Sequence, residues 1–167
     1  MTMPDPTHSR LPAKFIDTSL RLNINSGIYR IHQPATHRPV IKFPMFSSKV
    51  AAGFPSPADD YVEKDLDLNE LLVHKSEATF FVKAQGESML GAGIHNNDIL
   101  VVDRSIDPVT GKIVVCALNG ELTVKRLVFE HGIWHLKPEN PEYPNIEIYS
   151  DLDLVIWGVV TNVIHPV

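Results

Sequence analysis

From Thr79 onward, the sequence is divided into short apolar segments by residues that favour turns. The strongest turn signal is Asn119-Gly120, because both residues tolerate the positive φ angles of a two-residue hairpin turn. We therefore predict a mainly β fold, a compact bent sheet or partial barrel. The expected strands are residues 79–84, 98–103, 112–118, 121–129, 132–136, 145–149 and 152–164, with Gly158 as a bulge or bend in the last.

The sequence before Thr79 follows another pattern. Prolines interrupt residues 1–44, where apolar residues keep no sustained period, so we predict a flexible N-terminal arm. Residues 45–60 are predicted as a linker, whose small side chains at 51–53 would let the chain lie extended in a narrow cleft. Residues 61–167 are predicted as the β domain, with a short amphipathic helix near residues 68–72.

Charge and composition restrict the function. The formal net charge of −5 does not favour non-specific binding to nucleic acid. No apolar run reaches the ~18 residues that a membrane span needs, and the first residues do not resemble a signal peptide. The single cysteine, Cys116, lies in an apolar run and is expected to be buried and unreactive. These features predict a cytosolic protein without a membrane anchor.

Two polar side chains in the apolar pattern are candidates for catalysis. Ser88 follows an expected strand and Gly86, which permits a sharp turn. Its hydroxyl can act as a nucleophile beside backbone N–H groups that hold an oxyanion, or it can cap a short helix. Lys125 shares a strand face with Leu127 and Phe129, and burial there lowers the pKa of an amine. A neutral lysine can deprotonate a serine, although a lysine can also extend to solvent at the sheet edge.

Other candidate sites have weaker support. Eight histidines are scattered along the chain, and His131 and His135 lack the helical face of a metal-binding pair. We expect these two at the surface, and we predict no metal site and no cofactor. Asp98 and Asp103 stand at strand ends, where turn residues are common. Four aromatic residues are expected in the core and not as stacking platforms for bases: Phe80, Phe81, Trp134 and Trp157.

Three spaced motifs resemble the LexA/UmuD family of self-cleaving proteins, the peptidase S24 family. They are Gly86-Glu87-Ser88-Met89, Glu121-Leu122-Thr123-Val124-Lys125-Arg126-Leu127 and Val50-Ala51-Ala52-Gly53. The serine and the lysine are 125 − 88 = 37 positions apart, a spacing that fits the family. Residues 53–63 and 67–69 are more similar to UmuD than to LexA. The resemblance covers about residues 41–163.

This resemblance implies a mechanism. Ser88 is similar to the family's nucleophile and Lys125 to its general base. The bond between Ala52 and Gly53 corresponds to the one that is cut, and the backbone N–H groups of Ser88 and Met89 are expected to hold the oxyanion. The chain would then be a serine peptidase that cleaves itself.

The resemblance also implies partners. A UmuD-like protein of the SOS response to DNA damage is expected to be a cytosolic homodimer, whose cleavage is promoted by a RecA filament on single-stranded DNA. The trimmed form would act with a UmuC-type Y-family DNA polymerase in translesion synthesis and mutagenesis. Two features depart from the pattern. The arm before Pro39 is longer than a typical UmuD arm, and the cleavage site is Ala-Gly, as in LexA, instead of Cys-Gly.

Three other functions stay open. A LexA-like transcriptional repressor, inactivated by self-cleavage, would need a DNA-binding domain. We cannot place the three helices of a helix-turn-helix in residues 1–44. A leader-peptide processing enzyme can use the same Ser–Lys pair, but it would need a membrane anchor. The third alternative is a β scaffold that binds a polymerase without cleaving itself.

Overall fold

The computed structural model describes residues 11–15, 43–46 and 62–167. The chain divides into two compact units. Among the described residues, the larger unit comprises 11–15 and 75–167, and the smaller unit comprises 43–46 and 62–74. Most of the predicted arm and linker lies outside the described residues, so the domain boundaries at 44 and 60 stay predictions. None of the helices among the described residues is long and apolar enough to cross a membrane.

The smaller unit contains a two-stranded sheet and a short helix. Strand β2 (Phe43–Phe46) pairs antiparallel with β3 (Val62–Leu66), and helix α1 (Leu68–Leu72) follows. The side chain of Asp67 accepts a hydrogen bond of 2.8 Å from the backbone N–H of Asn69, which caps the first turn. The helix lies where the sequence predicted it, although none of its residues is buried.

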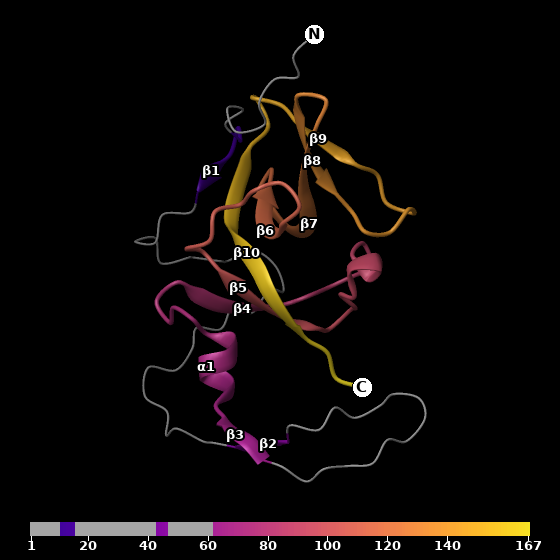
Figure 1. Ribbon diagram of the computed structural model, residues 1–167. Helices are drawn as coiled ribbons and strands as arrows, with labels where there is room; N and C mark the ends of the chain where they lie inside the picture. The colour runs from indigo at the N-terminus through magenta and orange to yellow at the C-terminus, as the bar shows by residue number, and fades with distance from the viewer. Residues whose placement is uncertain (1–10, 16–42, 47–61) are drawn as a thin grey trace. The chain divides into compact units, whose positions relative to one another are not determined.

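The larger unit is built on one sheet of eight strands (Figure 1), so the predicted mainly β fold is confirmed. Seven strands are neighbours in the order β4-β5-β10-β6-β7-β8-β9, and all six pairings are antiparallel. Their bounds are β4 Thr79–Lys83, β5 Ile99–Asp103, β6 Ile113–Leu118, β7 Glu121–Glu130, β8 Ile133–Lys137, β9 Ile146–Ile148 and β10 Leu154–Ile164.

Strand β1 (Lys14–Phe15) is the eighth member of the sheet and pairs parallel with β10. Lys14 lies opposite Val155, and its ammonium group contacts the carboxylate of Asp153 at 3.2 Å. These residues belong to the range for which a flexible arm was predicted. The sequence offers no signal for so short a strand, because its pairing partner is far along the chain.

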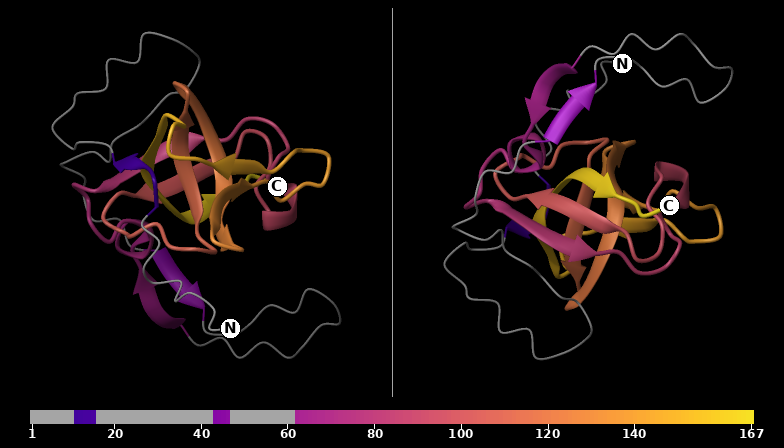
Figure 2. Two further views of the ribbon diagram at one scale, coloured as in Figure 1. Left: turned by 90° about the horizontal axis from the view of Figure 1, so that it is seen from above. Right: turned by 90° about the horizontal axis from the view of Figure 1, so that it is seen from below.

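Strand β10 joins the two halves of the sheet. It lies between β6 and β5 (Figure 1) and pairs with β6 over Leu154–Val159 and with β5 over Val159–Ile164. The register against β6 shifts between Ile156 and Gly158, so the predicted irregularity at Gly158 is confirmed. A strand that changes partner along its length curls the sheet, as the two views of Figure 2 show.

Two clusters of buried side chains form the core of the sheet, and β6 contributes side chains to both. Val115 belongs to one cluster, whereas Val114 and Cys116 belong to the other, because successive strand residues face opposite sides. Phe80 and Trp157 are buried and meet edge to face at 6.4 Å, as their predicted core positions require. Phe81 and Trp134 are half-buried.

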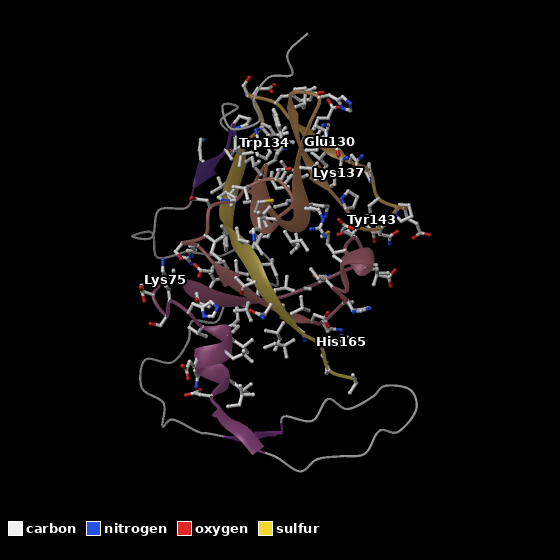
Figure 3. The ribbon with its side chains drawn as sticks, in the orientation of Figure 1. Lys75, Glu130, Trp134, Lys137, Tyr143 and His165 are labelled. Carbon is white, nitrogen blue, oxygen red and sulfur yellow. The ribbon has the colours of Figure 1, made fainter. Side chains whose placement is uncertain are left out.

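The hairpin between β6 and β7 fixes the register of the strand that carries Lys125. Asn119 and Gly120 have φ angles of +49° and +85°, which confirms the predicted turn. The turn sets Leu118 opposite Glu121 and, farther along, Val114 opposite Lys125. In the next hairpin, β7–β8, an ion pair of 2.6 Å joins Lys137 of β8 to Glu130 of β7 (Figure 3).

Candidate active site

Ser88 lies in the loop that follows β4. The loop turns at Gly86, whose φ angle is +86° and whose N–H donates a hydrogen bond of 3.0 Å to the side-chain oxygen of Asn96. Met89, which is 3% exposed, anchors the loop in the core. The short 3₁₀ helix η1 (Leu90–Ala92) begins after Met89 and has no side-chain cap. The alternative that Ser88 caps a helix is therefore wrong, and its hydroxyl has another partner.

That partner is Lys125 on β7. The lysine is 7% exposed, so it does not extend to solvent at the sheet edge. Its Nζ lies 3.0 Å from Ser88 Oγ, 2.9 Å from Thr123 Oγ1 and 3.0 Å from the carbonyl oxygen of Val124. The structure thus brings together the two side chains that the sequence singled out. Thr123 and the Val124 carbonyl had no assigned role.

The surroundings of Lys125 favour a neutral amine. Burial lowers the pKa of Lys125, and the negative charge of a Cys116 thiolate would oppose this shift. Burial also raises the pKa of the Cys116 thiol to about 12, so Cys116 carries no charge near neutral pH. A neutral amine has two N–H donors and one lone pair. Thr123 Oγ1 and the Val124 carbonyl can accept the two donors, which leaves the lone pair for the proton of Ser88.

A second loop, between β8 and β9, holds the Ser88 loop in place. The backbone N–H of Glu139 donates to the carbonyl oxygen of Ser88 at 2.8 Å, and the N–H of Gly91 donates to the carbonyl of Glu139 at 2.7 Å. The side-chain amide of Asn140 donates to the carbonyl of Glu87 at 3.0 Å. These three bonds fix the backbone on both sides of Ser88. No motif in the sequence pointed to them.

Arg126 connects β7 to this second loop. Its guanidinium donates to the carboxylate of Glu139 and, at 2.7 Å, to the carbonyl oxygen of Gly111. Both side chains of the ion pair are about one-third exposed. Consecutive residues of β7 therefore serve the site differently, since Lys125 contacts the hydroxyl directly and Arg126 supports the loop that holds it.

A cleft with a volume of about 80 Å³ opens beside Ser88. Its walls come from the end of β4 and the following loop, and from the first half of β7. Within the described residues, Glu121–Lys125 of β7 pairs with β6 on one side only, because β8 pairs from Arg126 onward. The cleft is lined by Val82, Lys83, Ala84, Gln85, Gly86, Ser88, Met89, Ile94, Val115, Leu122, Thr123 and Val124.

The backbone N–H groups of Ser88 and Met89 are the predicted oxyanion donors. No described residue accepts a hydrogen bond from the N–H of Ser88 or of Met89. Two such donors next to a nucleophile can stabilise a negatively charged oxygen. The predicted cleavage site, Ala52–Gly53, lies outside the described residues.

The structure also describes the aspartates and histidines that the sequence analysis considered. Asp103 is a turn residue, as expected, since its carboxylate accepts a hydrogen bond of 2.7 Å from the backbone N–H of Ser105. His131 is exposed and has a φ angle of +51°, whereas His135 is half-buried. Asp98 is buried and contacts the side chain of His165, a juxtaposition that the sequence did not indicate.

The chain is similar to known proteins over most of its length. Residues 44–161 match the family described as Peptidase S24-like. Protein SamA of Salmonella typhimurium is 48% identical over 122 residues, which cover 73% of this chain and 84% of SamA. Protein MucA of Salmonella typhimurium is 40% identical over 146 residues, which cover 86% of this chain and 93% of MucA.

A repressor matches at lower identity. LexA repressor 2 of Pseudomonas putida is 32% identical over 130 residues, which cover 78% of this chain and 63% of the repressor. The family match and the extent of the similarity to SamA and MucA agree with the motifs around Ser88 and Lys125. This chain therefore belongs to the peptidase S24-like family as a UmuD-like member, which confirms the family expected from its sequence.

Proposed function

We propose that this protein is a self-cleaving serine peptidase of the SOS response, with Ser88 as the nucleophile and Lys125 as the general base. The observation that carries the proposal is the 3.0 Å contact between Ser88 Oγ and Lys125 Nζ beside the cleft. This distance lies within the reach of direct proton transfer. The low exposure of Lys125 supports the second requirement, because burial lowers the pKa of its amine and so favours the neutral form that can act as a base.

In the first step, the lone pair of Lys125 Nζ takes the proton of the Ser88 hydroxyl while Oγ attacks the carbonyl carbon of Ala52. The carbonyl oxygen becomes an oxyanion, for which the N–H groups of Ser88 and Met89 are the donors. When the tetrahedral intermediate collapses, the Ala52–Gly53 bond breaks. The Lys125 ammonium then gives its proton to the amine of Gly53, and residues 1–52 remain bound to Ser88 as an ester.

In the second step, water replaces the departed amine. Lys125, neutral again, takes a proton from the water, which attacks the ester carbon. Collapse of the new intermediate returns the proton to Ser88 Oγ and releases the carboxylate of Ala52. Thr123 and the Val124 carbonyl keep the amine oriented through both steps, because they bind its two N–H donors.

The edge of β7 that has no partner strand among the described residues supports an extended cleavage segment. Residues Glu121–Lys125 can add a peptide as a further strand by backbone hydrogen bonds, which do not depend on the peptide's side chains. The small side chains of Ala51 and Ala52 suit the narrow cleft, and insertion of the segment would exclude water from Lys125. Residues 45–60 of the same or a second subunit are the proposed substrate.

The cellular role rests on the UmuD-like family membership. We propose a cytosolic homodimer whose cleavage is promoted by a RecA filament on single-stranded DNA. The trimmed form, which begins at Gly53, would join a UmuC-type Y-family DNA polymerase in translesion synthesis. No strong direct binding to DNA is expected, because the chain carries a net charge of −5.

The proposal is tested by incubating the purified full chain at increasing alkaline pH and sequencing the new N-terminus of the product. We expect Gly53 as that N-terminus, with no product from Ser88→Ala or Lys125→Ala. Matched controls are Ser76→Ala and Lys112→Ala, which change an exposed serine and an exposed lysine and should cleave like the parent. Cleavage at another bond, or unchanged cleavage in either site variant, would exclude this mechanism.

A further inference from the structure

A second group of titratable side chains stands apart from the Ser88–Lys125 pair. It consists of His95 in the loop before β5, Asp98 at the end of that loop, and His165. His165 follows the last residue of β10 and is labelled in Figure 3. Asp98 is 1% exposed, whereas the side chains of both histidines are nearly half-exposed. A buried carboxylate thus lies between two imidazoles that solvent can reach.

The geometry directs all three groups to one place. Asp98 Oδ1 lies 2.6 Å from His165 Nδ1, and Asp98 Oδ2 lies 3.7 Å from His95 Nδ1. The centres of the two imidazole rings are 4.6 Å apart, and one ligand atom from each residue lies within 4.8 Å of the others. The backbone N–H of His95 donates to Asp98 Oδ2 at 2.7 Å and so fixes the orientation of the carboxylate.

We propose that His95, Asp98 and His165 bind a divalent transition-metal ion, with Zn²⁺ as the best match. Two imidazole nitrogens and one carboxylate oxygen form a donor set that suits Zn²⁺, whereas Ca²⁺ and Mg²⁺ prefer sites made of oxygen. Ligand atoms about 2.0–2.2 Å from a zinc ion stand roughly 3–4 Å apart. The three groups therefore need small movements, which half-exposed histidines permit, and solvent can complete the coordination. This inference does not depend on the proposed self-cleavage.

The ion would connect two distant segments of the chain. His165 follows β10, and His95 belongs to a loop whose next two residues bind the turn before Ser88. Asn96 accepts the hydrogen bond from Gly86, and the N–H of Asn97 donates to the carbonyl of Ala84 at 2.9 Å. A metal bridge would thus secure the end of β10 to the loop that supports the Ser88 turn.

The alternative is that the three residues only form hydrogen bonds with one another, and the test must distinguish this arrangement from a metal site. In that case His165 donates its Nδ1 proton to Asp98, and the cluster has no affinity for metal. Both arrangements stabilise the fold, so a loss of stability in a variant cannot distinguish them. Binding of the ion itself does, because only the metal site holds Zn²⁺ or Co²⁺ at these three residues.

The experiment titrates the full chain with Zn²⁺ in a calorimeter and with Co²⁺ in a visible-absorption cell. We expect one ion per chain at this site and a visible Co²⁺ absorption band typical of a low coordination number. His95→Ala, His165→Ala and Asp98→Asn should each lower the Zn²⁺ affinity about 10-fold or more and abolish the Co²⁺ band. His131→Ala is the matched control, since it removes an exposed histidine elsewhere and should bind both ions like the parent.

Two results would overturn the proposal. The first is the absence of Zn²⁺ binding to the parent chain. The second is Zn²⁺ binding that is equal in the parent and His165→Ala, which would place the ion on other histidines. Should the buried Asp98→Asn variant fail to fold, His165→Ala still decides the question, because its side chain is nearly half-exposed.

Discussion

The backbone N–H of Glu139 donates a hydrogen bond of 2.8 Å to the carbonyl oxygen of Ser88. The carbonyl oxygen of Glu139 also accepts a hydrogen bond from the N–H of Gly91, and its carboxylate forms an ion pair with Arg126. This one residue of the β8–β9 loop therefore contacts the Ser88 loop twice and β7 once. The position of the Ser88 hydroxyl therefore depends on contacts that contain no reacting atom. This dependence can be tested separately from the chemistry.

Gly91→Ala should slow self-cleavage strongly. A Cβ atom at this position would stand 2.5 Å from the carbonyl oxygen of Glu139, a backbone atom that cannot rotate away. The Ser88 loop must shift, and a displacement of about 1 Å can reduce a rate about 10²-fold. Cleavage rates are measured by gel densitometry at fixed pH, together with urea unfolding.

The control for that experiment is Gly132→Ala, which strains the β7–β8 turn, where φ is +83°, at a position that does not line the cleft. It should lower the free energy of unfolding by about 1 kcal/mol without a comparable effect on the rate. If both variants slow cleavage equally, general loss of stability explains the result and the loop contact does not.

Arg126 and Glu139 should stabilise the fold as a pair. Their side chains are about one-third exposed, so solvent screens the attraction, and we expect a coupling energy of about 0.5–1 kcal/mol. The measurement is a double-mutant cycle with Arg126→Gln, Glu139→Gln and the double variant, each unfolded in urea. A coupling energy of zero would mean that the contact carries no stability.

The rate of self-cleavage should rise with pH and then level off. Only the neutral form of Lys125 can take the Ser88 proton, and burial lowers the pKa of Lys125 from the ordinary lysine value of 10.5. The midpoint of the rate profile should therefore lie below pH 10.5. Lys125→Arg should be inactive at every pH, because a guanidinium does not lose its proton. A midpoint at or above 10.5 would contradict a buried amine as the base.

The same lowered pKa makes stability depend on pH. Between the folded-state pKa of Lys125 and 10.5, the unfolded chain binds more protons than the folded one, so the free energy of unfolding rises with pH. The slope is at most about 1.4 kcal/mol per pH unit. The stability that Lys125 contributes is fully present above pH 10.5 and is lost as the pH falls through its folded-state pKa.

This linkage is measured by comparing Ser88→Ala with Ser88→Ala/Lys125→Met, two proteins that cannot cleave during urea unfolding. Their difference in stability should change with pH in the stated direction. Cys116 has the opposite effect, since its pKa is raised to about 12 and its contribution is lost as the pH rises above about 9. Because the charge of Lys125 lowers the pKa of Cys116, both proteins also carry Cys116→Ala, which removes this effect. A difference independent of pH would argue against a lowered pKa.

Leu127→Ala should destabilise the protein by about 2–5 kcal/mol. Leu127 is fully buried, two residues after Lys125 on the same strand, and its loss leaves a cavity in the second core cluster. Val109→Ala removes an apolar side chain that is 51% exposed and should change the free energy of unfolding by less than about 0.5 kcal/mol. Equal effects of the two substitutions would show that burial does not control stability here.

The strands and their turns were predictable because their signals are local. Alternating polarity around Lys125 and the Asn119-Gly120 turn can be read within a few residues, and both strand and turn lie where they were expected. The family motifs then selected Ser88 and Lys125, which the structure brings within 3.0 Å. These predictions use information that neighbouring residues carry themselves.

The contacts that support the site were not predictable, because neighbouring residues carry no signal for them. Glu139 acts through its backbone N–H and carbonyl, which every residue except proline possesses, so its identity carries no signal. Asp98 and His165 are 67 positions apart and meet only because β10 and β5 are paired. Thr123 lies within a recognised motif, yet its contact with Lys125 requires both side chains to bend toward each other on one strand face.

The turn at Asn119-Gly120 has a consequence for the evolution of this site. Inserting one residue there would move every side chain of β7 to the opposite face of the sheet. Val124 would then occupy the place of Lys125, and an aliphatic side chain would stand where a base is required. The chain could keep its strands and lose its chemistry, so purifying selection on the length of a distant surface turn should be as strict as selection on the lysine itself.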